Sequence, residues 1–180
     1  MAMTGWRLWK AAGAAGLALA ANCFALSAAM AAGIPESPAQ LRAARHTAAQ
    51  FEDLAGSPRN AWALVQGLRW GTAITLSAAR PVPQRVSFTS PAHRMGYGNI
   101  ARALAIARNE FAARRVRRPS PAQLETLLLG GTLRTGTGAA ARLVRTPGIL
   151  PLRAVHLGWG QIAHALAISP ASRVSAHASL

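Results

Sequence analysis

Cysteine, lysine and acidic residues are almost missing from this 180-residue chain. The one cysteine, Cys23, excludes an intramolecular disulfide and any zinc or iron–sulfur site built from several cysteines. Five Asp and Glu residues stand against 20 Lys and Arg, which gives a formal net charge of +15. Such a basic chain attracts polyanions such as nucleic acid, anionic lipid or acidic glycan. Arginine supplies all of the cations except Lys10, and a GC-rich genome is an alternative origin of this bias.

Residues that commonly carry catalysis are scarce as well. The five histidines form no pair at i and i+4 and no H-E-x-x-H motif, which are common spacings of metal ligands on a helix. The chain has no G-x-S-x-G nucleophile elbow and no phosphate-binding P-loop. The G-x-G-x-x-A pattern at residues 96–101 lacks the buried strand and the ribose-binding acid of a dinucleotide site. We therefore expect a protein that is not an enzyme and holds no cofactor or metal.

The first 31 residues have the order of a secretory signal peptide. Arg7 and Lys10 form a basic start, residues 11–32 carry no charge, and Ala29-Met30-Ala31 matches the small-x-small pattern for signal peptidase. We expect cleavage after Ala31, which leaves residues 32–180 as a single periplasmic or secreted domain. An uncleaved membrane anchor is the alternative, although the many Ala and Gly residues make this run less apolar than a good membrane-spanning helix.

Serine–proline pairs predict where helices begin in the rest of the chain. Serine caps a helix with its hydroxyl, and proline suits the first helical position because its missing N–H would be unpaired there anyway. Apolar residues at helical spacing follow three of these pairs, and glycines end each pattern. The three predicted helices follow Ser37, Ser57 and Ser120 and end at Gly56, Gly71 and Gly130-Gly131.

Only one segment has the alternation of a strand. Within residues 72–76, Ile74 and Leu76 alternate with threonine. Residues 77–94 are rich in proline, and residues 132–148 are mainly Gly, Thr and Arg, so both segments predict long loops. We thus expect a mainly all-α domain with at most one short strand, in which residues 95–168 are the best-ordered part.

The strongest signal is an internal repeat. The segment MGYGNIARALAIA at 95–107 aligns with LGWGQIAHALAIS at 157–169, and eight of thirteen positions are identical. Each copy predicts a glycine-flanked aromatic residue followed by a helix. We expect the two units to pack against each other, with both aromatic rings largely buried and the glycines permitting a sharp turn and close helix approach. The expected anchors are Gly96, Tyr97, Gly98, Ile100, Gly158, Trp159, Gly160 and Ile162.

The second copy also supports an alternative function. Residues 159–170 resemble the first helix and turn of helix-turn-helix DNA-binding proteins. A recognition helix should follow, but only residues 171–180 remain, with Arg173 as their one arginine. That segment is short for reading a major groove.

The densest charge lies at Arg114, Arg115, Arg117 and Arg118. Cations at the C-terminal end of a helix interact favourably with its dipole, so a solvated helix end accounts for part of this cluster. Four arginines within five residues also suit contact with a polyanion or an anionic surface. We take them as the candidate anion contact.

Three motifs resemble those of a family of uncharacterised exported proteins of Gram-negative bacteria. They are Leu64-Val65-x-x-Leu68-Arg69-x-Gly71-x-x-Ile74-x-Leu76, Met95-Gly96-Tyr97-Gly98-Asn99 and Leu157-Gly158-Trp159-Gly160-Gln161-Ile162-Ala163-His164. Ala167 departs from the pattern, because glycine is expected there. The resemblance implies export and no known activity, so it transfers no catalytic or ligand residue. We expect a non-enzymatic accessory or interaction protein whose partner is unknown, with an anionic macromolecule or envelope component as the candidate.

Export generates the first prediction. The chain expressed with its own N-terminus in a Gram-negative host should yield a mature protein that begins at Ala32, because the basic start, apolar run and small-x-small site direct cleavage there. N-terminal sequencing of the periplasmic and culture fractions measures this. A cytosolic protein that still begins at Met1 would contradict export and favour the DNA-binding alternative.

Overall fold

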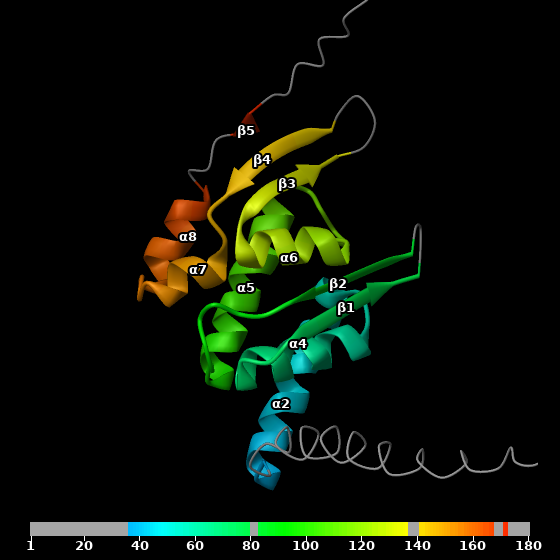
Figure 1. Ribbon diagram of the computed structural model, residues 1–180, viewed down its shortest axis with the longest axis vertical. Helices are drawn as coiled ribbons and strands as arrows, with labels where there is room; N and C mark the ends of the chain where they lie inside the picture. Colours follow the sequence, from blue (N-terminus) through cyan, green and yellow to red (C-terminus); the bar gives the residue numbers. More distant parts are fainter. Residues whose placement is uncertain (1–35, 80–82, 137–140, 168–170, 173–180) are drawn as a thin grey trace, which may run out of the picture. The chain divides into compact units, whose positions relative to one another are not determined.

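Helix α5 (Tyr97–Ala113) is the element around which the other helices pack (Figure 1). Its buried side chains recur at intervals of three and four residues, so they form one apolar stripe along the helix. The stripe consists of Ile100, Ala103, Leu104, Ala107 and Phe111. The positions of the surrounding elements follow from the need to cover this stripe.

The computed structural model describes residues 36–79, 83–136, 141–167 and 171–172. Apart from Glu36, these residues belong to one compact unit, which is mainly helical as the sequence predicts. The helices besides α5 are α2 (Pro38–Gln50), α3 (Glu52–Ala55), α4 (Pro58–Trp70), α6 (Pro121–Leu129), α7 (Ile149–Ala154) and α8 (Trp159–Ala167). The strands are β1 (Ile74–Ala78), β2 (Gln84–Phe88), β3 (Gly131–Thr135), β4 (Arg142–Thr146) and β5 (Ala171–Ser172).

Serine caps begin three helices where the sequence predicts them. In α2, α4 and α6 the hydroxyls of Ser37, Ser57 and Ser120 each accept a hydrogen bond from the backbone N–H three residues later. Helix α4 ends at Gly71 in the left-handed region, and α6 ends at Gly130. The first predicted helix differs from expectation, because a break at Phe51 divides it into α2 and α3.

The predicted strand at residues 72–76 is present as β1, which continues to Ala78. The two predicted loops are wrong, because β2 lies within the first and most of a β-hairpin lies within the second. Strands β1 and β2 pair antiparallel, as do β3 and β4, and β5 adds to the outer side of β4. In the first hairpin Leu76 lies opposite Val86. In the second, Leu133 lies opposite Val144. The expectation of at most one strand therefore also fails within the described residues.

The sequence pattern of each hairpin is weak, for a local reason in each case. The residues of β2 alternate only weakly, with Phe88 buried and Val86 half-buried, and prolines stand close to both ends of the strand. In β3 and β4 half of the buried positions are threonines, Thr135 and Thr146. Threonine suits a strand but is not apolar enough to mark a buried face in a sequence pattern.

The repeat is larger than its 13-residue alignment. The first unit is α4, the hairpin β1–β2 and α5, and the second is α6, the hairpin β3–β4 and the pair α7–α8. Both units therefore run from a serine-capped helix through a hairpin to a helix with the glycine–aromatic–glycine start. As predicted, the repeated helices meet, since α5 contacts α8 and Ile100 and Ile162 are fully buried.

An amide side chain closes the outer edge of the first strand in each unit. Asn60 donates from Nδ2 to the carbonyl of Ser77 at 2.8 Å and accepts from the Ser77 N–H on Oδ1 at 3.1 Å. Gln123 donates from Nε2 to the carbonyl of Arg134 at 2.7 Å. Both amides occupy the third position of their helix, three residues after the serine cap. This shared position supports a duplication of the whole helix–hairpin unit.

The aromatic residues of the repeat are less buried than the sequence predicts. Tyr97 and Trp159 are half-buried at the margin of the core. No side chain or backbone atom approaches within 4 Å of a Cβ built on Gly96, Gly98 or Gly160, and none of the four motif glycines has a positive φ. The glycines therefore serve neither a sharp left-handed turn nor close helix packing. The close approach occurs at Gly67, where a Cβ would lie 2.1 Å from Ile74 Cγ1.

The core also includes elements that precede residue 95. Fully buried side chains also come from α2, α4 and β1, including Ala44, Leu64 and Ile74. None of the helices in the described ranges is long and apolar enough to cross a membrane. The predicted signal peptide at residues 1–31 lies outside the described residues.

The amide contact predicts a specific loss of stability. Replacing Asn60 with Ala should lower the free energy of unfolding by about 1–3 kcal/mol, because the buried carbonyl of Ala55 and the backbone groups of Ser77 would lose their partner. Urea denaturation followed by circular dichroism measures the change. The control is Asn109→Ala on the exposed face of α5, which should stay within about 0.5 kcal/mol of the parent chain. Equal effects at the two positions would contradict this role of Asn60.

Candidate anion-binding cleft

The structure separates the four clustered arginines into different roles. Arg114 is internal: it forms an ion pair with Glu110, and its Nη2 donates to the carbonyl of Leu166 in α8 at 3.4 Å. Arg115, Arg117 and Arg118 are exposed. Arg114 therefore joins α5 to α8, whereas Arg115, Arg117 and Arg118 remain candidate anion contacts.

A turn at the end of α5 separates Arg114 from its neighbours. Val116 N–H donates to the carbonyl of Phe111 at 2.8 Å, and Arg115 N–H donates to the carbonyl of Ala112 at 2.9 Å. These two bonds define a Schellman motif, in which the residue that reverses the chain adopts the left-handed conformation. Arg115 occupies that position with φ 58°. Glycine is the usual residue there, because it has no Cβ to strain.

The reversed chain forms one wall of a cleft of about 540 Å³. We call it the arginine cleft. Its lining comes from α3, the end of α5 and the segment after α5. The apolar lining residues are Leu54, Phe111, Ala112, Val116 and Pro119, and the charged ones are Asp53, Arg108, Arg115 and Arg117.

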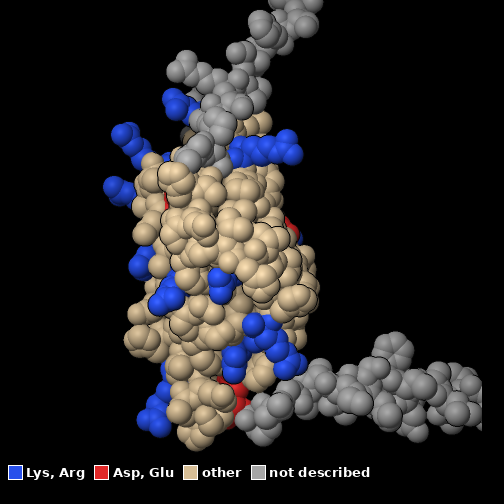
Figure 2. Space-filling model, turned by 90° about the vertical axis from the view of Figure 1, so that its left-hand side faces the viewer, with Lys and Arg blue, Asp and Glu red and all other residues tan. Residues whose placement is uncertain are grey.

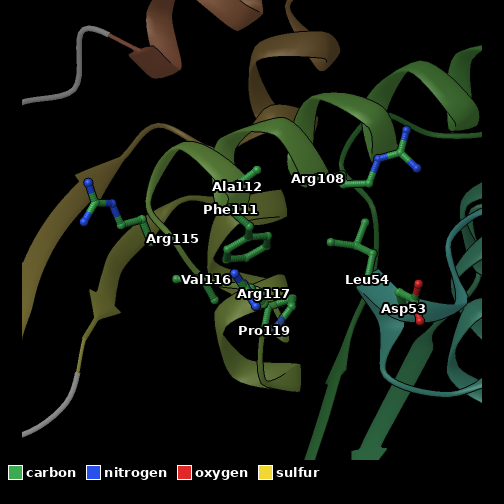
Figure 3. A pocket seen from close by; sticks show the side chains of 9 residues that line it. All are labelled: Asp53, Leu54, Arg108, Phe111, Ala112, Arg115, Val116, Arg117 and Pro119. Atoms are coloured by element: carbon green, nitrogen blue, oxygen red, sulfur yellow. The ribbon is translucent and has the colours of Figure 1, made fainter.

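Figure 3 shows how these side chains are arranged. Phe111 lies in the middle of the cleft, with Arg115 on one side and Arg108 on the other. Arg117 lies beneath Phe111 in this view, and Asp53 is on the side of Arg108. The guanidinium of Arg108 also stacks over the ring of Phe51, 5.3 Å from its centroid. In this view the guanidinium groups of Arg108 and Arg115 point away from Phe111, whereas that of Arg117 lies beside it.

The charge of the cleft is largely unneutralised. Among the residues that the structure describes, no carboxylate forms an ion pair with any of the three lining arginines. Three cations and one carboxylate, Asp53, give the lining an excess of positive charge. Figure 2 shows that basic side chains are also spread widely over the visible face, so charge alone does not single out the cleft. The concave shape and the apolar lining of the cleft distinguish it from the rest of the basic surface.

The side chains of the arginine cleft are suited to binding an anion. No group of three or more His, Cys, Asp or Glu residues that could hold a metal occurs in the described ranges. The cleft offers guanidinium groups, which donate hydrogen bonds and remain protonated at every ordinary pH. Such groups recognise carboxylate, phosphate or sulfate oxygens.

Sequence reasoning found Arg115 and Arg117 but missed the rest of the cleft. Arg118 does not line it, whereas Arg108 does. One signal was available, because Arg108, Phe111 and Arg115 follow each other at three- and four-residue spacing, which places them on one side of a helix end. The contribution of α3 had no local signal.

No protein-family model, no curated protein and no solved structure matches the chain. The resemblance to exported Gram-negative proteins therefore stays a prediction.

The DNA-binding alternative requires a recognition helix after α8. The described residues in that region are Ala171 and Ser172, which pair with Val144 and Leu143 of β4 as strand β5. Residues 168–170 and 173–180, including Arg173, lie outside the described part of the chain. The strand pairing gives this alternative no support.

The separation of the arginines is testable by stability. Arg114→Ala should lower the free energy of unfolding by about 1–2 kcal/mol, because it removes a partly screened ion pair and the contact with α8. Arg118→Ala, which makes the same change at an exposed position, should remain within about 0.5 kcal/mol. Urea titration of both variants measures the difference. Similar free energies of unfolding for the two variants would show that Arg114 behaves as a surface cation.

Proposed function

We propose that the protein is an exported, non-enzymatic binding protein that takes up a polyanionic partner at the arginine cleft. The observation that carries the proposal is the left-handed Arg115. The turn places Arg115 in the lining of a cleft that also includes Arg108 and Arg117. Export itself rests on the N-terminal sequence pattern.

The left-handed backbone of Arg115, which His93 and His156 share among the described residues other than glycine, supports a functional role. Helices α3 and α4 end on glycine in the left-handed region, at Gly56 and Gly71, where that conformation costs little. A residue with a Cβ is less stable there. Strained residues of this kind cluster at binding sites. An arginine that serves only as a solvated helix end would gain from replacement by glycine.

The composition of the lining indicates the kind of partner. Guanidinium groups bind anionic oxygens, and the more accessible apolar lining residues, Ala112 and Val116, can contact apolar parts of the same partner. The three arginines lie on different sides of Phe111, so one small ion cannot satisfy all of them (Figure 3). A polymer or surface with repeated negative charges fits this spread better.

Salt dependence tests the cleft. Replacement of Arg108, Arg115 and Arg117 with Gln should weaken binding to heparin, used as a model polyanion, and should reduce the slope of log K against log salt, because fewer counterions are released. Isothermal titration at several salt concentrations measures the slope. The matched control replaces three exposed arginines elsewhere, Arg45, Arg102 and Arg145, so that the net charge is the same. Equal losses of heparin affinity in the two variants would show that the cleft contributes only as part of the general surface charge.

A single substitution separates binding from folding. Arg115→Gly should leave the melting temperature unchanged or raise it, since glycine tolerates φ 58° without strain. The same variant should bind heparin more weakly than the parent chain. A higher melting temperature with unchanged heparin affinity would show that Arg115 is not a ligand contact.

A further inference from the structure

The repeated aromatic residues hold arginines in the same way in both units. The guanidinium of Arg69 stacks over Tyr97 at 5.3 Å, and its Nη1 donates to the carbonyl of Met95 at 3.4 Å. The guanidinium of Arg153 stacks over Trp159 at 5.0 Å, and its Nη1 donates to the carbonyl of Leu157 at 3.0 Å.

In each unit the accepting carbonyl belongs to the residue two positions before the aromatic ring. The two arginines come from different elements, α4 and α7. We call these arrangements the first and second arginine–aromatic clamps. Their common geometry assigns a role to the repeat motif that core packing does not explain.

The first clamp carries a second cation. Arg69 also stacks over Trp70 at 5.1 Å, and Arg94 approaches the same ring at 5.7 Å. Trp70 is held in place by a hydrogen bond of 2.9 Å from its Nε1 to Gln66. Two guanidiniums therefore lie against one fixed indole ring. In the second unit the residue aligned with Arg94 is His156, so that clamp lacks a second permanent cation.

The two guanidiniums of the first clamp are not neutralised by protein groups. In the described ranges no carboxylate pairs with Arg69 or Arg94. The Nε atom of Arg69 is buried and has no hydrogen-bond partner among the described residues. The two guanidinium carbons lie 5.1 and 5.7 Å from the centroid of the Trp70 ring, and an anion between them would be attracted by both.

The adjacent start of α5 adds to the positive potential. Gly96 caps this helix without a side-chain hydrogen bond, so its first N–H groups point outward with the positive end of the helix dipole. Gly96 and Gly98 are exposed, and among the described residues no atom outside the local backbone lies within 4 Å of the Cβ position of either. Glycine at such positions leaves the backbone open to close approach by a ligand.

We propose that Arg69 and Arg94, held against Trp70, form a discrete binding site for one phosphate group. Two guanidiniums match the double negative charge of a phosphate dianion better than the single charge of a carboxylate, and the planar fork of each suits two phosphate oxygens. The phosphate group can be free or the end of a phosphomonoester. This site does not depend on the arginine cleft, because the two share no residue.

Tryptophan fluorescence of the full chain tests the site, because Trp70 touches both cations. Titration with inorganic phosphate at constant ionic strength should give a saturable change that is lost in Trp70→Phe. Acetate should give a much weaker response. Glycerol 3-phosphate distinguishes the sources: binding at least as tight as that of inorganic phosphate identifies a phosphomonoester, and weaker binding identifies the free ion. A response that acetate or chloride reproduces would overturn the proposal.

Matched variants separate binding from folding. Arg94→Gln, at an exposed position, should raise the apparent Kd about tenfold or more, the size expected when charge-assisted hydrogen bonds are lost. Arg69→Lys should weaken binding similarly, whereas Arg153→Lys makes the same change in the second clamp and should leave the titration unaltered. If Arg69→Lys lowers only the melting temperature and the phosphate titration is unchanged, the clamp is purely structural and the proposal is wrong.

The arginine-cleft variant completes the test. Substitution of Arg108, Arg115 and Arg117 with Gln should leave the phosphate titration intact, because none of these residues belongs to the first clamp. Loss of the fluorescence response in that variant would assign the phosphate to the cleft and overturn the separate site. The heparin and phosphate experiments can therefore fail independently.

Discussion

Burial of the apolar stripe on α5 is the constraint on which the rest of the structure depends. Much of the apolar content of the chain is alanine, and an alanine side chain removes little area from water. Helix α5 brings together Ile100, Leu104 and Phe111, with Ala103 and Ala107 on the same face. Small residues between large ones let neighbouring helices approach closely. Helices from both halves of the chain consequently contact this one stripe.

The hairpins depend on the helices around α5. A two-stranded hairpin is marginally stable in water on its own. Here the outer edges of β1 and β3 are closed by Asn60 and Gln123, and α6 contacts β2 and β3. The inward side chains of the strands, such as Leu76 and Leu133, join the helical core. The hairpins are thus parts of one core, and the same solution occurs in both duplicated units.

The shortage of acids decides how the arginines are held. Five acids cannot pair with 20 cations, so aromatic faces and main-chain carbonyls take the place of carboxylates as partners. Such partners orient a guanidinium without neutralising it. Arg69 and Arg153 keep their full charge in fixed positions for this reason. A composition rich in arginine and poor in acids therefore leaves cations that are held in place but not neutralised, and these can bind an anion.

The sequence by itself determined the mainly helical class, the serine-capped helix starts and the existence of a repeat, because capping and helical periodicity act over a few residues. Only the tertiary structure decided the hairpins, since threonine marks no buried face until a partner strand covers it. It also decided that Tyr97 supports Arg69 instead of filling the core. Part of the cleft could be predicted: Arg115 and Arg117 are close in sequence, whereas Asp53 joins the lining only through the packing of α3 near the end of α5. Burial and charge neutralisation depend on residues distant in the chain, which no local pattern encodes.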